Sequence, residues 1–254
     1  MQNSSSWTPS KFVYHNGKLG PSMDKNAVSV ASRLPVYLVA SFYEKHIPTY
    51  AKGSLLDLGC GKVPLYQVYK DHVNEVTCVD WENTLHKNEY LDHVADLNQP
   101  IPLEDNTFDT IILSDVLEHI REPEKLWQEM NRVLRTGGNA LINVPFYYWL
   151  HEKPFDYYRY TQFALQNFAE KNNFEILHLQ PYGGAVEILV DILSKAILPN
   201  IKGGNRLVSR LQKSAWWFAN TAKGKKLRQS TSQNFPFGYE MVVRKMEGNS
   251  TSNA

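Results

Sequence analysis

The residues best suited to chemistry lie around two glycines, Gly59 and Gly61. They end an apolar stretch from Ser54 to Leu58 that is typical of a short buried strand, and we expect a helix to begin near Val63. A strand, a glycine-rich turn and a helix allow backbone amides to approach a ligand closely, because glycine has no Cβ. Two glycines alone also occur in ordinary turns.

Two further residues narrow the choice of ligand. A dinucleotide-binding fingerprint would have a third glycine at position 64, where this chain has Pro64. Asp57, two residues before the first glycine, would repel a pyrophosphate and would suit a cationic ligand. S-adenosylmethionine, which carries an ammonium and a sulfonium group, is such a ligand.

The segment Asp57-Leu58-Gly59-Cys60-Gly61 resembles the first motif of class I S-adenosylmethionine-dependent methyltransferases. The resemblance continues in order over roughly residues 50–180, through Asp80, Ala95-Asp96-Leu97, Phe108-Asp109, Val116-Leu117-Glu118-His119, Leu134-Arg135-Thr136-Gly137-Gly138 and Val144-Pro145. It implies methyl transfer with S-adenosylmethionine as cofactor. It says little about the acceptor.

The resemblance also implies which residues bind the methyl donor. Besides the backbone of Gly59, Cys60 and Gly61, these are Asp57 for the ammonium group, Asp80 for the ribose hydroxyls, Trp81 for the adenine face, Asp96 and Leu97 for the adenine edge, and Ser114 and Asp115 for the methionine part. All follow or end predicted strands, where ligands of parallel sheets bind. Asp80 could instead only cap a turn. Asp109 begins its strand and is interpreted as structural.

The acceptor residues are expected in residues 145–161, which follow a predicted strand and are rich in aromatic residues. This connection is about 15 residues long, against about 2–6 in ordinary α/β units. It resembles a segment of methyltransferases associated with polysaccharide and glycolipid biosynthesis, in which His151, Asp156 and Arg159 would contact the acceptor. Alternatively the segment is a folded lid in which Asp156 pairs with Arg159 and Thr161 caps the next helix.

Two histidines could act on the acceptor. His151 is the preferred general base, and His119 could be a base or could fix its loop by a hydrogen bond. Asp115, Glu118 and His119 also resemble the set with which some quinone O-methyltransferases hold a divalent ion. Because Glu-His at this position is common in members without a metal, the sequence analysis assigns no metal site. The remaining histidines, among them His46 and His178, are interpreted as surface or packing residues.

Composition limits the class of protein. The chain has 254 residues, 43% of them hydrophobic, and a net charge of +1, which gives no overall attraction to nucleic acid. Its two cysteines, Cys60 and Cys78, lie in a turn and in a predicted buried strand, so we expect no disulfide. We find no signal-peptide pattern and no apolar stretch of about 18 residues. We expect a cytoplasmic protein, with possible attachment to the inner face of the membrane.

One segment differs from the rest of the chain in its charge. Residues 192–239 contain nine lysines and arginines and no acidic residue, whereas the rest of the chain has 18 basic and 26 acidic residues. Tryptophans beside lysines, as at Trp216 and Trp217, suit an interfacial helix on an anionic membrane. The alternative is a helical cap over the acceptor pocket with solvated lysines. No nucleic-acid partner is expected.

The predicted fold is a Rossmann-like class I methyltransferase sandwich, in which a mostly parallel seven-stranded sheet has helices on both faces. The strands are predicted at 54–58, 75–80, 91–95, 108–114, 140–144, 174–179 and 239–245, and the helices at 63–71, 123–135, 161–172, 185–197 and 205–220. Residues 1–47 would form an extension, irregular to residue 23 and then helical, with a helix starting at Pro35. Residues 48–247 would form the methyltransferase domain, with a helical insertion at about 183–228, and 248–254 a disordered tail.

The sequence thus predicts a methyltransferase, most directly one that methylates oxygen on a sugar or on a glycan- or glycolipid-linked acceptor. Two alternatives stay open. One is a small aromatic or quinone-like acceptor. The other is a protein that binds S-adenosylmethionine without turnover.

Overall fold

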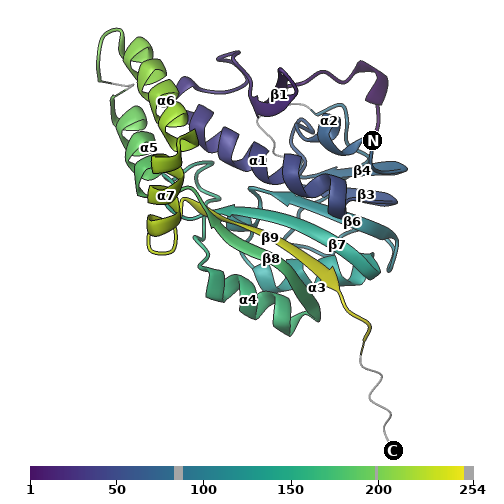
Figure 1. Ribbon diagram of the computed structural model, residues 1–254. Helices are drawn as coiled ribbons and strands as arrows, with labels where there is room; N and C mark the ends of the chain where they lie inside the picture. Colours follow the sequence, from purple (N-terminus) through teal and green to yellow (C-terminus); the bar gives the residue numbers. More distant parts are fainter. Residues whose placement is uncertain (83–87, 198–199, 249–254) are drawn as a thin grey trace, which may run out of the picture.

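A seven-stranded sheet forms the centre of the molecule in the computed structural model, which describes residues 1–82, 88–197 and 200–248 (Figure 1). The strand order is β5-β4-β3-β6-β7-β9-β8. The strands are β3 (Ser54–Leu58), β4 (Glu75–Asp80), β5 (His93–Val94), β6 (Phe108–Ser114), β7 (Leu134–Pro145), β8 (Phe174–Tyr182) and β9 (Gly238–Lys245). The pairs among β3 to β7 are parallel, and β9 runs antiparallel to both of its neighbours. The predicted mostly parallel sheet is confirmed.

Alternate residues of the central strands pack into two cores, one on each face of the sheet. Leu56 of β3 faces α3 (Pro123–Val133) and α4 (Gln162–Lys171), whose Trp127 and Leu165 are fully buried there. Leu55 points to the other face, where it packs with α1 (Arg33–Tyr50) and α2 (Tyr66–Tyr69). Such double-sided burial accounts for the continuous apolar runs of these strands.

The chain reverses its direction across the sheet between β3 and β6. From β3 it proceeds through β4 to β5 at one edge, and then returns to β6 and β7 on the other side of β3. At this switch point the loops after β3 and β6 diverge above the carboxyl ends of the strands, and a ligand site forms there in open α/β sheets.

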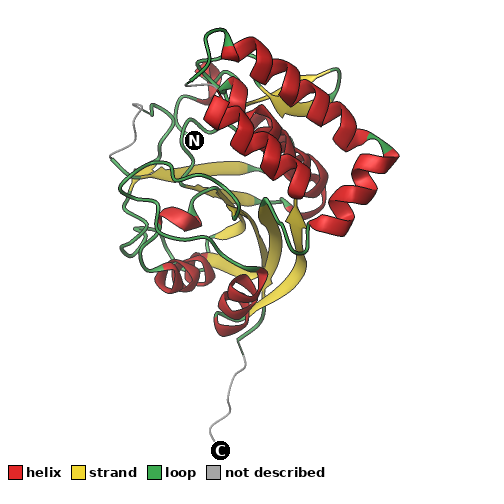
Figure 2. Ribbon diagram, turned by 90° about the vertical axis from the view of Figure 1, so that its left-hand side faces the viewer, coloured by secondary structure: helices red, strands yellow, loops and turns green. Residues whose placement is uncertain are grey.

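Three helices stand beyond the carboxyl ends of the parallel strands (Figures 1 and 2). They are α5 (Ala185–Ile197), α6 (Gly204–Asn220) and α7 (Ala222–Thr231), and they connect β8 to β9. The predicted helices at 185–197 and 205–220 are confirmed to within one residue. The domain boundaries stay predictions, and the predicted tail from residue 249 lies outside the described residues.

The N-terminal segment differs from the prediction of an irregular chain. Residues Phe12–His15 (β1) and Lys18–Pro21 (β2) form an antiparallel hairpin, in addition to short 3-10 turns at Ser4–Ser6 (η1) and Val30–Ser32 (η2). Asn16 and Gly17 have φ of 50° and 77° in its turn. This is the residue pair that favours a tight hairpin turn, so the sequence contained the necessary pattern.

Three predicted helix ends were wrong. The helix of residues 27–47 begins at Arg33 rather than Pro35, and it follows a 3-10 turn rather than a first α-helix. The helix at 63–71 is reduced to α2 because Val63 has φ +50°, which no α-helix tolerates. α3 ends at Val133, and Gly137 lies within β7 at φ +77° instead of ending the helix.

Candidate active site

A cavity of about 740 Å³ opens at the switch point of the sheet. Its walls come from the turn after β3, the loop after β6, the start of α1 and the segment after β7. The residues that matter for its chemistry are Lys11, Gly59, Cys60, Gly61, Ser114, Asp115, Glu118, Tyr148 and His151. A second cavity of about 640 Å³, between the hairpin, α1 and α6, is mostly apolar and is not lined by any of these residues.

The glycine turn fits a ligand that approaches the backbone. Gly59 has φ +67°, and a Cβ there would lie 2.5 Å from Val116 Cγ2. Gly61 has φ +50°, and a Cβ there would meet nothing within 4 Å, so its backbone faces open space. The turn can therefore hold a small ligand against main-chain atoms, as the sequence predicts for the methyl donor.

Asp57 and Asp80 lie behind this turn. The Asp57 carboxylate is 3% exposed and accepts a hydrogen bond of 2.9 Å from Tyr69 Oη, a residue that the sequence analysis did not single out. Burial raises the pKa of Asp57 to about 7, against the lowering effect of that hydrogen bond. Asp80 Oδ2 accepts from Gly61 N at 2.8 Å, so Asp80 does fasten the turn, which was the alternative to ribose binding. Neither carboxylate lines the cavity.

The residues expected around the adenine are spread more widely. Trp81 packs edge-to-face with Phe155, with ring centroids 4.8 Å apart. Asp96 is exposed and accepts a hydrogen bond from Asn98 N, whereas Leu97 is buried in the core. Their roles in adenine binding stay predictions.

Ser114 and Asp115 line the cavity, and their contact with the methionine part of the cofactor stays a prediction. Asp115 has φ +53°, and its carboxylate is held by Asn143 Nδ2 at 2.6 Å and Lys11 Nζ at 3.0 Å. Asn143 in turn accepts a hydrogen bond from Tyr43 Oη of α1. Neither Asn143 nor Lys11 was predicted from the sequence. Asn143 could have been noticed as a polar residue in a buried strand, but nothing local indicated Lys11.

His151 has one ring nitrogen beside a carboxylate. Its Nδ1 lies 3.3 Å from Asp156 Oδ2, and the same oxygen accepts a hydrogen bond of 2.9 Å from the backbone N of His151. Burial and the neighbouring His119 lower the pKa of the His151 ring, so the neutral ring is favoured. A neutral imidazole oriented by a carboxylate can accept a proton.

Asp156 and Arg159 support His151 from behind. Two hydrogen bonds, of 2.5 and 2.8 Å, join the Asp156 carboxylate to the Arg159 guanidinium, and neither residue lines the cavity. Burial raises the pKa of Asp156, but the hydrogen bonds from Arg159 and from the His151 backbone outweigh it and lower the pKa to about 2. The interpretation as a folded lid is therefore right for this pair. Thr161 caps α4 by accepting from Ala164 N at 3.2 Å.

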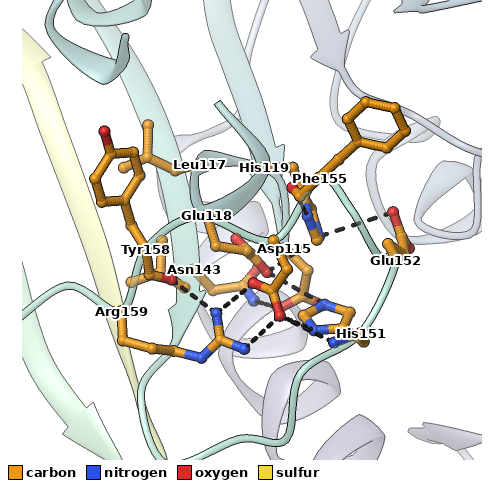
Figure 3. Close-up of polar contacts among 12 residues, drawn as sticks. Asp115, Leu117, Glu118, His119, Asn143, His151, Glu152, Phe155, Tyr158 and Arg159 are labelled. Atoms are coloured by element: carbon orange, nitrogen blue, oxygen red, sulfur yellow. Dashed lines mark hydrogen bonds and ion pairs between the residues drawn. The ribbon is translucent and has the colours of Figure 1, made fainter. Parts of the chain in front are cut away.

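His119 and Glu118 complete this end of the cavity. His119 Nδ1 lies 2.9 Å from Phe155 O, which ties the loop after β6 to the segment after β7. The fully buried Glu118 lies next to both histidines (Figure 3). Burial and the carboxylate of Asp115 raise the pKa of Glu118 well above its usual range.

Part of this chain is similar to known methyltransferases. Residues 56–142 match a family model described as a methyltransferase domain. Thiol S-methyltransferase TMT1B of Mus musculus is 36% identical over 97 residues, which make up 34% of this chain and 39% of the mouse protein. The match thus spans well under half the length of that relative.

Solved structures show the same fold at low sequence identity. The cyclase SpnF superposes with a TM-score of 0.54 at 18% identity, covering 84% of either chain. An S-adenosylmethionine-dependent methyltransferase from Archaeoglobus fulgidus superposes with a TM-score of 0.51 at 15% identity. The superposition covers 85% of this chain and 93% of the other. Residues 56–142 therefore carry a methyltransferase domain, and the chain has the fold of S-adenosylmethionine-dependent methyltransferases, whose cofactor is S-adenosylmethionine.

Proposed function

We propose that this protein transfers a methyl group from S-adenosylmethionine to a hydroxyl oxygen of a sugar or of a glycan-linked acceptor. The observation that carries the proposal is the pairing of His151 with Asp156 at the cavity wall, with 3.3 Å between Nδ1 and the carboxylate. A hydroxyl must lose a proton to become an ether oxygen, and a histidine beside a carboxylate can take that proton.

The chain's own residues have three tasks in this reaction. When bound, S-adenosylmethionine supplies a methyl group activated by the sulfonium charge, so that a carbon–oxygen bond forms as the carbon–sulfur bond breaks. Ser114 and Asp115 help to align the reactants, and the segment after β7 excludes water. His151 Nε2 takes the hydroxyl proton while Asp156 holds the proton on Nδ1. Asp156 and Arg159 thus act as positioning residues, not as acceptor contacts.

Aromatic side chains favour a sugar over a smaller acceptor. Tyr148 lines the cavity, and Tyr147 and Trp149 are 42% and 57% exposed beside it. Exposed aromatic rings of this kind pack on the apolar faces of sugar rings. The resemblance of the same segment to methyltransferases of polysaccharide and glycolipid biosynthesis supports the proposal.

Two other functions have some support. The similarity to thiol S-methyltransferase favours a small thiol as acceptor, and a thiol would need a weaker base because its own pKa is lower. The likeness to a cyclase shows that this fold also serves other reactions, so binding without methyl transfer is the second alternative.

Labelled methyl transfer tests the proposal. Purified protein, methyl-labelled S-adenosylmethionine and an extract of the source cells are combined, and the products are separated into lipid, polysaccharide and small-molecule fractions. We expect label in the lipid or polysaccharide fraction. His151→Gln should bind the cofactor in calorimetry and lose at least 100-fold in transfer rate, whereas His178→Gln, at a residue that does not line the cavity, should retain the rate. Label only in small thiols would exclude the glycan acceptor.

We further propose that the acceptor is carried on a lipid and that the helices after β8 dock on an anionic membrane. α5 has its polar side inward: Glu187 and Asp191 are 2% exposed, and Ser194 is fully buried. Glu187 pairs with Arg228 of α7 at 2.7 Å, and Asp191 with Lys195 at 2.6 Å.

The apolar side of α5 faces outward. Leu189, Ile192 and Leu193 are 59%, 56% and 48% exposed and share one face at helical spacing. On the inward side of the same helix, Lys195 Nζ lies 3.7 Å from the ring centroid of Tyr148, so α5 adjoins the segment that lines the cavity. Among the described residues of the insertion none lines the cavity itself, so the alternative of a cap over the acceptor pocket is not supported.

The charge of the neighbouring helices is complementary to anionic lipid. Lys213 of α6 and Lys223, Lys225 and Lys226 of α7 are exposed. Trp217 of α6 is 67% exposed. Each lysine near an anionic surface contributes about 1 kcal/mol. None of the described helices is both long and apolar enough to cross a membrane.

Flotation with vesicles tests the docking. We expect the protein to float with vesicles that contain phosphatidylglycerol, less so with pure phosphatidylcholine, and less at high salt. The triple variant L189S, I192S, L193S should lose binding to both kinds of vesicle. The triple variant K223Q, K225Q, K226Q should lose only the preference for anionic lipid. Absence of flotation at low salt, or equal flotation of all three proteins, would refute it.

A further inference from the structure

Glu118 is a buried carboxylate with unmet bonding capacity. Its side chain is fully buried, and neither carboxylate oxygen has a hydrogen-bond partner among the residues that the structure describes. Buried carboxylates are normally paired or coordinate a metal, because leaving them without a partner is costly. The mechanism proposed above assigns no task to Glu118.

Two imidazoles turn their Nε2 atoms toward this carboxylate. His119 Nε2 and His151 Nε2 each lie 3.8 Å from Glu118 Oε1 (Figure 3). This is too long for a hydrogen bond. It is close to the separation of roughly 3.3–3.6 Å between two ligands that share one ion at about 2.0–2.1 Å. The relevant ligand atoms of all three residues lie within 4.8 Å of one another.

The other nitrogen of each ring faces an oxygen that can orient it, and that of His119 makes a hydrogen bond, whereas that of His151 has only a carboxylate contact. His119 Nδ1 faces the carbonyl oxygen of Phe155 at 2.9 Å, and His151 Nδ1 faces Asp156 Oδ2 at 3.3 Å. With the proton on Nδ1, each Nε2 has a free lone pair. Carbonyl and carboxylate groups behind metal-bound histidines fix the ring in this way.

We propose that Glu118, His119 and His151 bind a divalent transition-metal ion such as Zn²⁺, with an open coordination position toward the cavity. Two imidazoles and one carboxylate form a donor set of catalytic zinc sites, and such sites keep a position for water or substrate. This set differs from the one suggested by the sequence. The Asp115 carboxylate already accepts hydrogen bonds from Lys11 and Asn143. The third ligand is therefore His151, from the segment after β7.

A second cluster of similar composition serves as an internal comparison. His46, His178 and Glu240 also lie close enough to hold an ion. There, however, His178 Nε2 and Glu240 Oε1 are 2.9 Å apart, so the carboxylate already has a partner. We therefore assign the ion to Glu118 and not to Glu240.

The role of the ion in catalysis, which rests on the proposed function, is to bind the acceptor oxygen. A bound cation lowers the pKa of a coordinated hydroxyl, which makes the oxygen a better nucleophile. His151 Nε2 would then be a ligand and could not also take the proton, which would leave to solvent. Metal binding therefore decides which of the two tasks His151 performs.

Metal titration of the purified full chain, without S-adenosylmethionine or acceptor, tests the inference. After treatment with a chelator, Co²⁺ is added and its visible absorption is followed, and bound Zn²⁺ is counted by equilibrium dialysis. We expect one equivalent with the spectrum of a low-symmetry nitrogen and oxygen site. Glu118→Gln and His151→Gln should weaken binding more than 100-fold. Asp156→Asn, behind the ligand, should weaken it about 10–100-fold.

His178→Gln is the matched control, because it removes a histidine from the other cluster. It should keep the full equivalent and the Co²⁺ spectrum. The inference is overturned if the wild-type protein binds no Co²⁺, or if the His178 variant loses the ion while the Glu118 variant keeps it. Because no methyl transfer is measured, these results are independent of the proposed acceptor.

Discussion

Asp57 has its carboxylate turned into the protein, although the resemblance assigns it to the cofactor. Burial raises its pKa to about 7, and Tyr69 is its hydrogen-bond partner. The folded protein therefore keeps a proton on Asp57 up to about pH 7, whereas the unfolded chain releases it near pH 4. The folded state is consequently destabilised as the pH rises from 4 to 7, and the loss persists above pH 7.

Asp57→Asn should remove this pH dependence. We expect the variant without cofactor to equal the wild type near pH 4 and to exceed its stability by roughly 2–4 kcal/mol at pH 8. Urea unfolding at several pH values measures the difference. As a control, Asp109→Asn should be less stable than the wild type at pH 8, because it weakens an ion pair with Arg135. Identical pH profiles of the wild type and Asp57→Asn would contradict the assignment.

The two glycines of the turn should differ in their tolerance of a side chain. Gly59→Ala places a Cβ 2.5 Å from Val116 in a left-handed conformation, so we expect a loss of about 2–4 kcal/mol and a weaker affinity for S-adenosylmethionine. In Gly61→Ala the new Cβ would have no atom within 4 Å. The only cost is the strain of a left-handed backbone, roughly 1 kcal/mol. Thermal unfolding and calorimetry compare the two, and equal losses would show that the contact with Val116 is unimportant.

Among the elements, the helical insertion is attached to the rest of the chain through Gln212. This fully enclosed amide of α6 donates to Ala31 O and to Ser194 Oγ, both at 2.9 Å, and accepts from Leu34 N at 2.8 Å. It thus joins α6 to α5 and to the start of α1, over sequence separations of up to 181 residues. No periodicity in the sequence indicates such a contact.

Gln212→Met should therefore loosen the insertion. The replacement is similar in volume but leaves Leu34 N and Ala31 O without their partner, so we expect a loss of roughly 2–4 kcal/mol. Lys213→Met, one residue further on the exposed side, should change stability by less than about 0.5 kcal/mol. Chemical unfolding measures both, and limited proteolysis should cut the first variant faster within residues 183–228. A stable Gln212 variant would be the contrary result.

For the whole molecule, the cavity is built from segments that are far apart in the sequence. Lys11, Val39, Gly61, Asp115 and Phe237 all line it. A ligand that bridges the N-terminal segment, the strand ends and the residue before β9 should stabilise the entire fold.

S-adenosylmethionine at 100 times its Kd should stabilise the folded protein by about 2.7 kcal/mol and raise Tm by roughly 5–10 °C. Differential scanning calorimetry measures the shift. Asp80→Asn should reduce it, because the amide holds the Gly61 backbone less firmly. An unchanged Tm of the wild type at saturating cofactor would argue against binding at this cavity.

The sequence alone determined the central strands and the glycine turn that lines the cavity. Buried parallel strands are continuous apolar runs, and residues 54–58, 75–80 and 108–114 were predicted with their observed bounds for this reason. The glycine turn and the residues after β6 follow from their places at strand ends. The strands and the turn both depend on the conformational preferences of residues that are close together in the sequence.

Only the tertiary structure decided which side chains meet. Glu118, His119 and His151 converge because the segment after β7 folds back over the loop after β6, and the leucines of α5 face outward because its carboxylates pair inward. Lys11 reaches Asp115 across 104 residues. Such contacts depend on the packing of whole elements, which local sequence patterns do not encode.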